Sequence, residues 1–295
     1  MMDFVEYLSK ELNIKKDCIS RVWQELSSNQ LYLINNHHKR YVAKRYANPI
    51  HGGIEIYILS KCLERKEIKA PVLLHVENHE KWGYWIVYEY ISGKPLVFAS
   101  DQISEENIIA LWAEIGRQLN YFHNTNFISN IDCDGVEKQI IEKTEINFNA
   151  IMQKENIHFE AIHFLREHND LLRNHSAIRT VIFDLTNKHL IVDNPNNHWE
   201  LVGLIDFEQA KIGYIFRDFV FVYCDYFFSH PAWKDAFFDG YGVANDKDFT
   251  KLVYYFILQY ALECGGILAQ ISPSNKEYGR ILIENTMAKL VLLPL

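Results

Sequence analysis

Hydrophobic and polar positions in the first part of the chain predict two short helices followed by a β-hairpin. Apolar residues recur at helical spacing in residues 3–12 and 16–24, which is the pattern of an amphipathic helix. Two strand-like runs, 31–34 and 40–46, then flank the polar residues 35–38. A pair of such runs around a short polar turn is typical of an antiparallel hairpin.

The rest of the chain changes from strands to helices. Apolar spacing predicts a helix over 54–63 and two strands over 72–76 and 84–90. From residue 103 onward the pattern is mainly helical, with two short strand-like interruptions. The helical segments and interruptions, in chain order, are 107–122, 137–173, 180–193, 200–206 and the region from Asp218 to the end.

Strands followed by helices, without regular alternation, are typical of an α+β fold. We therefore expect a β-rich N-terminal lobe over residues 1–91 and a larger, mainly helical C-terminal lobe over residues 92–295. Gly93 and Pro95 punctuate the chain at this boundary.

Composition narrows the classes of partner. The 295 residues carry a formal charge of −8, which argues against nucleic acid as the main partner and is compatible with a cationic small molecule. The five cysteines are widely spread without a CxxC pair, and the N-terminus lacks the features of a secretory signal, so we expect a cytoplasmic protein. The apolar stretch 252–271 is interrupted by Gln259 and Glu263, which favours a packed helix and no membrane partner.

Two aspartates, Asp184 and Asp206, stand beside strand-like apolar runs. Kinase-type phosphoryl transfer needs one carboxylate that orients a hydroxyl and accepts its proton, and a second that holds magnesium on the phosphates. An aspartate beside a buried strand is also a common turn or cap residue. Either aspartate alone therefore carries little information, and the surrounding motifs decide.

The order of these motifs resembles the aminoglycoside phosphotransferase and choline kinase-like family, over roughly residues 20–245. Lys44 lies in the strand-like segment YVAKR, and Glu55 begins the following helix. Asp184 matches the aspartate of the family's His-Gly-Asp-Leu-x-x-x-Asn loop, and Asp206 lies in the segment IDFE. The resemblance implies a two-lobed, protein kinase-like fold, and Asp218 matches an aspartate that braces the catalytic loop.

The resemblance also implies roles at a nucleotide site. Lys44 would contact the phosphates of ATP, with GTP as the alternative, and Glu55 would hold Lys44 in place. Glu64 is the alternative partner for Lys44. The segment containing Glu89 and Ile91 resembles the hinge that holds adenine through backbone groups.

In the same way, Asp206 is implied to hold Mg²⁺, with Mn²⁺ as the alternative, and Asp184 is implied to act as the catalytic base. His189 stands where the family has a metal-binding Asn. Imidazole nitrogen prefers softer metals than Mg²⁺, so His189 is a candidate metal ligand, a phosphate contact or a packing residue.

Two further departures concern the loops. Ile182 and Phe183 replace the His-Gly that precedes the catalytic aspartate, and the phosphate-covering turn offers Ser27 and Ser28 in place of glycine. Serine hydroxyls can donate hydrogen bonds, so these two residues are candidate phosphate contacts.

Two hypotheses follow. The first is an ATP-dependent phosphotransferase that acts on a hydroxyl of a small molecule, an aminoglycoside-, choline- or amino-alcohol-like acceptor that a cationic charge would suit. The second is a catalytically impaired, kinase-like protein that binds a nucleotide or another ligand, motivated by the altered residues around Asp184.

Overall fold

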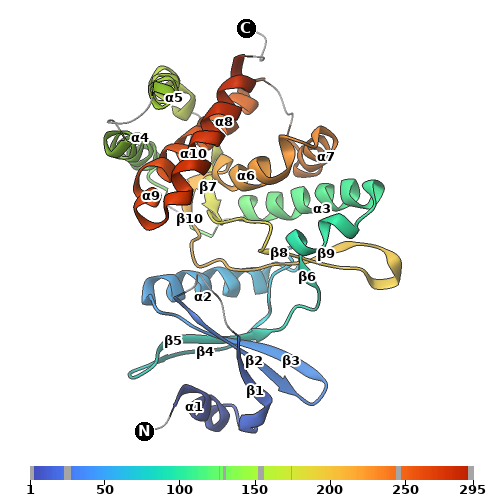
Figure 1. Cartoon of the computed structure of the whole chain (residues 1–295). Helices are drawn as coiled ribbons and strands as arrows, with labels where there is room; N and C mark the ends of the chain where they lie inside the picture. The colour runs from blue at the N-terminus through green and yellow to red at the C-terminus, as the bar shows by residue number, and fades with distance from the viewer. Residues whose placement is uncertain are drawn as a thin grey trace. The chain divides into compact units, whose positions relative to one another are not determined.

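The computed structural model of the chain describes residues 3–22, 28–125, 127–128, 131–151, 156–173, 175–243 and 247–291. By its internal contacts the chain forms two compact units. The N-terminal unit comprises residues 1–107 and 188–210, and the C-terminal unit comprises residues 108–187 and 211–295. The elements of both units are labelled in Figure 1.

This grouping differs from the predicted division at residue 91 because residues 188–210 return to the N-terminal unit. They form β8 (Leu190–Asp193) and β9 (Glu200–Leu204), which build a three-stranded antiparallel sheet with β6 (Lys94–Pro95). Pairing between strands so distant in sequence leaves no local hydrophobic pattern.

The main sheet of the N-terminal unit has five antiparallel strands in the order β1-β2-β3-β5-β4. Their bounds are β1 (Ile19–Val22), β2 (Gln30–Asn36), β3 (Lys39–Arg45), β4 (Leu73–His79) and β5 (Gly83–Glu89). The predicted hairpin is confirmed as β2 and β3, with Leu31 opposite Lys44. The two predicted strands that follow are confirmed as β4 and β5.

The predicted helix over residues 16–24 is wrong for residues 16–22, and residues 23 and 24 lie outside the described part of the chain. Lys16–Cys18 form a short 3₁₀ turn, and the chain then enters β1, where Ile19 pairs with Ile34 and Val22 with Leu31. The three-residue spacing of Ile19 and Val22 fits a helix, but both residues are β-branched and suit a strand that has a partner. Pairing with β2 therefore overrides the local pattern.

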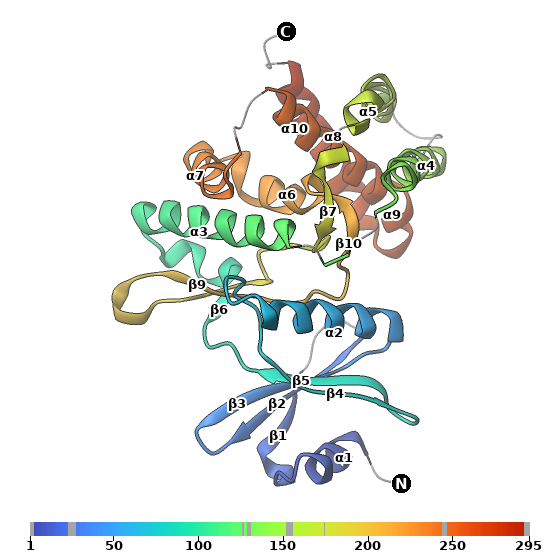
Figure 2. The same ribbon diagram turned by 180° about the vertical axis from the view of Figure 1, so that it is seen from behind.

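Helices cover both faces of this sheet, as Figure 1 and the reverse view in Figure 2 show. On one face, α1 (Phe4–Glu11) buries Phe4, Tyr7 and Leu8 in a core with Trp85 of β5. This helix confirms the prediction over residues 3–12.

The opposite face carries α2 (Pro49–Glu64), which spans the predicted helix 54–63 and begins earlier. Gly52 permits its close approach, since a Cβ atom there would lie only 2.9 Å from the side chains of Tyr46 and Tyr84. The position of α2 in turn brings Glu55 against the sheet.

The C-terminal unit is mainly helical, with one two-stranded antiparallel sheet of β7 (Ile178–Val181) and β10 (Lys211–Tyr214). Its helices are α3 (Glu105–Asn124), α4 (Cys133–Ile151), α5 (Asn156–Glu167), α6 (Phe216–Val222), α7 (Pro231–Tyr241), α8 (Lys247–Gly265), α9 (Ile267–Ile271) and α10 (Pro273–Val291).

At the centre of this unit, α8 packs against α10, α6 and α4, and it runs beside α10 in both ribbon views (Figure 1, Figure 2). The segment Lys247–Ile271 is long and apolar enough to cross a membrane by composition, but 67% of its most apolar window is buried inside the protein. This is the pattern expected of a core helix.

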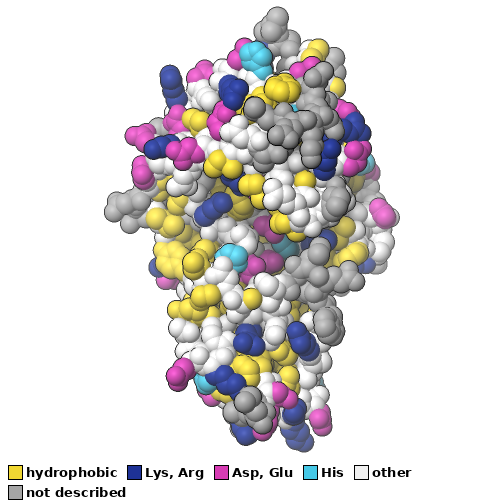
Figure 3. Space-filling view, turned by 60° about the vertical axis from the view of Figure 1, so that its left-hand side comes forward, with side chains coloured by type: hydrophobic (Ala, Val, Ile, Leu, Met, Phe, Trp, Pro, Cys, Tyr) yellow, Lys and Arg dark blue, Asp and Glu magenta, His cyan; other side chains and the backbone are white. Residues whose placement is uncertain are grey.

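Charged side chains are spread over the surface. On the face shown in Figure 3, acidic and basic side chains are interspersed. The net charge of −8 is therefore not gathered into one acidic patch on this face.

Candidate functional site

Lys44 is the centre of a buried ion cluster in the N-terminal unit. Its Nζ atom lies 2.6 Å from Oε2 of Glu55, 2.6 Å from Oδ1 of Asp206 and 2.8 Å from Oε2 of Glu208. The side chains of Lys44 and Glu55 are only 6% and 3% exposed, whereas that of Asp206 is 34% exposed. Glu64, the alternative partner, instead pairs with Lys61.

The cluster changes the pKa values of its members. Burial alone would lower the pKa of Lys44, but Glu55 and Asp206 outweigh burial and raise this pKa well above its usual value. Burial raises the pKa of Glu55 against the opposing effect of Lys44. Burial also acts to raise the pKa of Asp206, but Lys44 and His189 outweigh it and lower that pKa. Asp206 is thus the ionised, accessible carboxylate of the cluster.

Local structure explains how Glu55 reaches Lys44. The side chain of Asn48 caps α2 by accepting a hydrogen bond from the N–H of Ile50 at 2.9 Å, and Pro49 follows in the first turn. The hydroxyl of Tyr46 donates to Oε2 of Glu55 at 2.8 Å. The carboxylate of Glu55 therefore has two fixed partners, and its position is set before any ligand binds.

The hairpin of β8 and β9 brings His189 and Asp206 together. The N–H of Ile205 donates to the carbonyl oxygen of His189 at 3.1 Å, and Nε2 of His189 lies 3.4 Å from Oδ2 of Asp206. Asp206 has a left-handed backbone with φ of 69°. Such a conformation is uncommon for a residue other than glycine, although aspartate tolerates it better than most, and strained backbone of this kind clusters at functional sites.

A cavity of about 300 Å³ in the N-terminal unit adjoins this cluster. Apolar and aromatic residues form part of its wall: Leu31, Tyr88, Pro95, Phe98 and Ile205. Lys44, Lys188, His189 and Asp206 supply the charged and polar part. An apolar wall beside an ammonium and a carboxylate suits a ligand with a flat ring and a charged phosphate chain.

The donor atoms of the cluster fit a divalent cation. Carboxylate oxygens of Glu55, Asp206 and Glu208 lie within 4.8 Å of one another. Oxygen is the donor that Mg²⁺ prefers, and the nitrogen of His189 beside Asp206 would suit Mn²⁺ better. Because the side chain of Glu55 is only 3% exposed, whereas those of Asp206 and Glu208 are 34% and 16% exposed, Asp206 and Glu208 are the residues that would hold the metal.

Glu208 and Asn29 belong to this site although the sequence did not assign them a role. Asn29 donates from Nδ2 to Oε2 of Glu208 and accepts at Oδ1 from the N–H of Ala47 at 3.0 Å. Glu208 could have been found from the sequence, because it lies only two residues after Asp206. Asn29 lies in the turn expected to cover the phosphates, but its link to Glu208 joins residues far apart in sequence.

Of the other predicted nucleotide contacts, Ser28, Glu89 and Ile91 are not part of the ion cluster around Lys44. Ser27 lies outside the described residues, and Ser28 is exposed just before β2. Glu89 ends β5, and its N–H donates to the carbonyl oxygen of Val72 at 3.0 Å. Glu89 and Ile91 follow closely after Tyr88 in the chain, and Tyr88 is part of the wall of the cavity.

Asp184 lies in the C-terminal unit, in the loop that follows β7, and Asp218 of α6 holds this loop. Oδ2 of Asp218 accepts a hydrogen bond from the N–H of Ile182 at 2.8 Å, and Oδ1 accepts one from the N–H of Phe183 at 2.6 Å. The predicted bracing role of Asp218 is therefore confirmed. Ile182 is fully buried, and Phe183 has a φ of 72°, so the backbone keeps a glycine-like shape at the position where the family has glycine.

Asp218 is itself fixed by two residues distant in sequence. Nε2 of His123 lies 2.9 Å from Oδ2 of Asp218, and Nδ1 of His123 lies 2.7 Å from the hydroxyl of Tyr241. A Cβ atom at Gly240 would lie only 2.0 Å from the carbonyl oxygen of Ala113. Glycine there lets α7 approach α3 and brings Tyr241 to His123.

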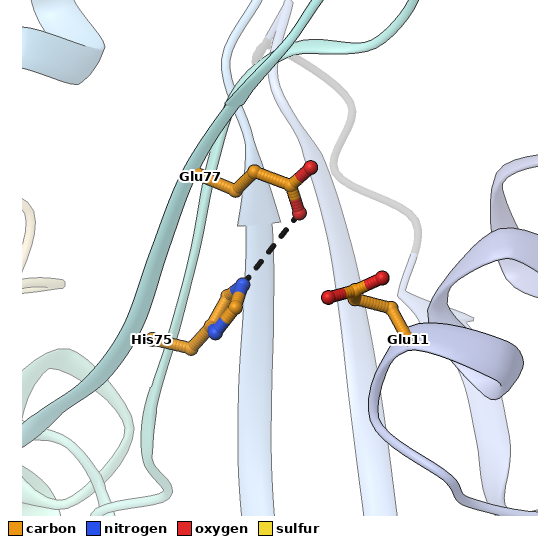
Figure 4. Close-up of side chains that lie close together, drawn as sticks. All are labelled: Glu11, His75 and Glu77. Atoms are coloured by element: carbon orange, nitrogen blue, oxygen red, sulfur yellow. Dashed lines mark ion pairs between the residues drawn. The ribbon is translucent and has the colours of Figure 1, made fainter.

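A second group of potential metal ligands lies on the α1 side of the N-terminal sheet. Glu11, His75 and Glu77 place one ligand atom each within 4.8 Å of one another, and Nε2 of His75 lies 3.6 Å from Oε2 of Glu77 (Figure 4). The hydroxyl of Tyr7 donates to Glu77 at 2.6 Å, and the ring of His75 packs on Trp85. These contacts link α1 to β4, and we assign the group a structural role.

Solved structures share this fold over nearly the whole chain. The GDP complex of wild-type aminoglycoside 2'-phosphotransferase-IIIa matches with a TM-score of 0.72 at 14% identity, covering 96% of each chain. ADP-bound aminoglycoside phosphotransferase APH(2'')-Ib matches with a TM-score of 0.62 at 15% identity, covering 95% of each chain. Spectinomycin phosphotransferase APH(9)-Ia, in complex with ADP and spectinomycin, gives 0.53 at 14% identity, covering 91% of this chain and 87% of that chain.

These likenesses confirm the predicted α+β, protein kinase-like fold. No curated protein matches the chain in sequence. The model of the phosphotransferase enzyme family, however, matches residues 21–253, which is most of the chain. The chain therefore belongs to the phosphotransferase enzyme family.

Proposed function

We propose that the chain transfers the γ-phosphate of ATP, or of GTP, to a hydroxyl group of a small molecule. The observation that carries this proposal is the placement of Lys44 between Glu55 and Asp206 beside a cavity with an apolar wall. Family membership supports phosphoryl transfer, and the GDP and ADP complexes of the structural relatives support a nucleotide donor.

In this proposal the N-terminal unit holds the nucleotide. The base would lie against apolar residues such as Leu31 and Tyr88, and Lys44 would bind phosphate oxygens. Asp206 and Glu208 would hold Mg²⁺, with Mn²⁺ as the alternative, and His189 would stand beside them. The metal supplies positive charge that offsets the charge on the phosphates in the transition state.

Asp184 would act on the acceptor. It orients the hydroxyl, whose oxygen forms a bond to the γ-phosphorus while the bond from that phosphorus to the β–γ bridging oxygen breaks. The hydroxyl proton passes to Asp184, and the nucleoside diphosphate leaves with the bonding electrons. Asp218 positions Asp184 indirectly because it fixes the preceding backbone at Ile182 and Phe183.

Relatives in complex with kanamycin, gentamicin or spectinomycin support a small hydroxyl-bearing acceptor. These complexes are the basis for an aminoglycoside-like acceptor. Choline-like and amino-alcohol acceptors rest on the sequence resemblance alone.

A second candidate is a kinase-like protein that binds a nucleotide without turnover. The observation that favours it is Phe183, which places a large side chain at a left-handed backbone position directly before Asp184. The intact cluster around Lys44 and the bracing of the loop by Asp218 favour the enzyme.

Calorimetric titration with ATP and GTP tests the proposal, with Mg²⁺, with Mn²⁺ and without metal. The wild type is compared with Asp206→Asn and with Asp193→Asn, which alters a carboxylate at the end of β8 that does not line the cavity. We expect metal-dependent binding that Asp206→Asn weakens about tenfold or more, since a charged metal ligand is lost, and that Asp193→Asn leaves unchanged. A folded wild type that binds neither nucleotide would refute both candidates, and binding without phosphoryl transfer to any hydroxyl compound would favour the second.

A further inference from the structure

The C-terminal unit contains a cavity of about 110 Å³ whose charge differs from that of the whole chain. It lies between α4, α8 and the β7–β10 pair, and Phe183 forms part of its wall. Three basic side chains, Lys143, Lys211 and Arg217, line it together with one acidic side chain, Glu263. The cavity therefore carries an excess of positive charge, although the net charge of the whole chain is −8.

Arg217 is the buried member of this group. Only 8% of the residue is exposed, and its Nη1 atom is buried without a hydrogen-bond partner among the residues that the structure describes. Its guanidinium instead lies 4.5 Å from the ring centre of Phe183 and 4.8 Å from that of Tyr260. A buried N–H donor without an acceptor is costly, so such groups are normally satisfied by a water, an ion or a ligand.

Lys211 and Lys143 differ in their partners. Lys143 is neutralised by Glu263, with Nζ 2.9 Å from Oε1. Nζ of Lys211 lies 3.2 Å from the ring centre of Phe183, and no carboxylate of the described residues lies within ion-pair distance. Burial, Lys143 and Arg217 lower the pKa of Lys211 to about 8. Glu263 thus forms its ion pair with Lys143, and among the described residues neither Lys211 nor Arg217 has a carboxylate within ion-pair distance.

We propose that this cavity binds the anionic group, a carboxylate or a phosphate ester, of a small molecule through Arg217 and Lys211. An anion there would accept the free N–H of Arg217 and offset the charge of Lys211, and charge-assisted hydrogen bonds of this kind are among the strongest available. Lys143 is already paired with Glu263, so it would add to the positive electrostatic potential in the cavity without contacting the anion.

The position of the cavity beside the loop of Asp184 indicates that its ligand is the acceptor of the proposed phosphoryl transfer. Phe183 lies in its wall and is followed directly by Asp184, the residue proposed to take the acceptor's proton. On the basis of the proposed function, the acceptor is therefore a hydroxyl compound that carries an acidic group. A polycationic aminoglycoside would meet like charge at this point, which disfavours the cationic acceptor expected from the overall composition.

Binding of inorganic phosphate, lactate and kanamycin to the full chain without nucleotide tests this assignment by calorimetry. Lys211→Met removes one of the two binding cations. The residue as a whole is exposed and only its ammonium is withdrawn from water over the ring of Phe183, so the variant should still fold. Arg217→Lys keeps the charge but loses the planar donor arrangement. Lys138→Met is the matched control, because it removes the same charge from an exposed position on α4 outside the cavity.

We expect saturable binding of phosphate or lactate that falls about tenfold or more in Lys211→Met and in Arg217→Lys and is unchanged in Lys138→Met. The stronger of the two ligands identifies the phosphate or the carboxylate class. No binding of either anion by the folded wild type, an equal loss in Lys138→Met, or kanamycin binding by the wild type that Lys211→Met weakens would each overturn the assignment. Kanamycin binding that improves in Lys211→Met is the result expected from the removal of a like charge. Anion binding in a protein that binds no ATP would leave the cavity assignment standing and count only against the proposed phosphoryl transfer.

Discussion

Nζ of Lys44 lies 2.6 Å from Oε2 of Glu55, and the two side chains are almost completely withdrawn from water. Burying such a pair costs solvation on both sides, so the pair adds little stability by itself, but the loss of either partner leaves an isolated buried charge. Asp206 and Glu208 add two more carboxylates around the same ammonium. One ammonium is therefore the shared counter-charge of three carboxylates.

Lys44→Met should destabilise the protein strongly. We expect a loss of about 3–5 kcal/mol in the free energy of unfolding near neutral pH, since three carboxylates then face one another without a cation. Chemical denaturation measures this loss, and Lys61→Met, which alters an exposed pair with Glu64, is the matched control and should change the stability little.

The loss in Lys44→Met should also depend on pH. In the wild type the raised pKa of Lys44 means that its stabilising charge is fully present below the usual value of 10.5 and is lost only above it, so this contribution is constant between pH 5 and pH 8. In the variant, the already raised pKa of Glu55 rises further, and protonation relieves the repulsion as the pH falls. A deficit that is larger at pH 5 than at pH 8 would contradict this account of the cluster.

Asp218→Ala should destabilise the loop before Asp184. The buried N–H of Ile182 and the partly buried N–H of Phe183 lose their acceptor, and a buried group left without one costs about 1–3 kcal/mol. Asp218→Asn keeps one acceptor oxygen and should lose less, while Asp235→Ala, at an exposed position of α7, should lose almost nothing. Urea unfolding gives the order of the three variants, and equal stability of Asp218→Ala and Asp235→Ala would show that the braces are unimportant.

Asp184→Asn should separate chemistry from nucleotide binding. A general base contributes about 10²–10⁴-fold to the rate, so turnover with a hydroxyl acceptor should fall by that order. The nucleotide affinity should stay close to that of the wild type, because the proposed nucleotide contacts all come from the N-terminal unit. Comparable turnover in wild type and variant would remove Asp184 from the mechanism.

Lys211→Met should change stability in a pH-dependent way. The pKa of Lys211 is lowered from 10.5 to about 8 by burial, Lys143 and Arg217, with Glu263 as the opposing charge. A lowered pKa means that protonated Lys211 is less favourable in the folded state than in the unfolded state. The resulting loss in the free energy of unfolding is fully present below pH 8 and is relieved as the pH rises toward 10.5. The variant should therefore gain stability relative to the wild type at pH 7, and this gain should shrink by pH 10. Urea unfolding at the two pH values checks this, and a gain that grows with pH would be the opposite result.

Local patterns in the sequence were sufficient for most elements. The hairpin of β2 and β3 follows from two strand-like runs around a polar turn, and α1 and α3 follow from apolar residues at helical spacing. Residues 19–22 were mistaken for helix because their apolar spacing suits both structures. Only the partner strand β2 decides between them.

The candidate site was predicted in part. Lys44, Glu55, Asp206 and His189 were found by their order and flanking residues, and the structure brings these four together in the N-terminal unit. Glu208 and Asn29 were missed because their hydrogen bond joins residues 179 positions apart. A single sequence without homologues carries no mark of such a contact.

The sequence by itself determined the fold class and the types of residue available for chemistry, because helix and strand periodicity and motif order are local properties of the chain. The tertiary structure decided which charges meet: Lys44 with three carboxylates in one unit, and Lys211 and Arg217 beside each other in one cavity of the other, without an ion pair to any described residue. The physical reason is that an electrostatic interaction depends on separation in space and on burial, and neither is a function of position along the chain.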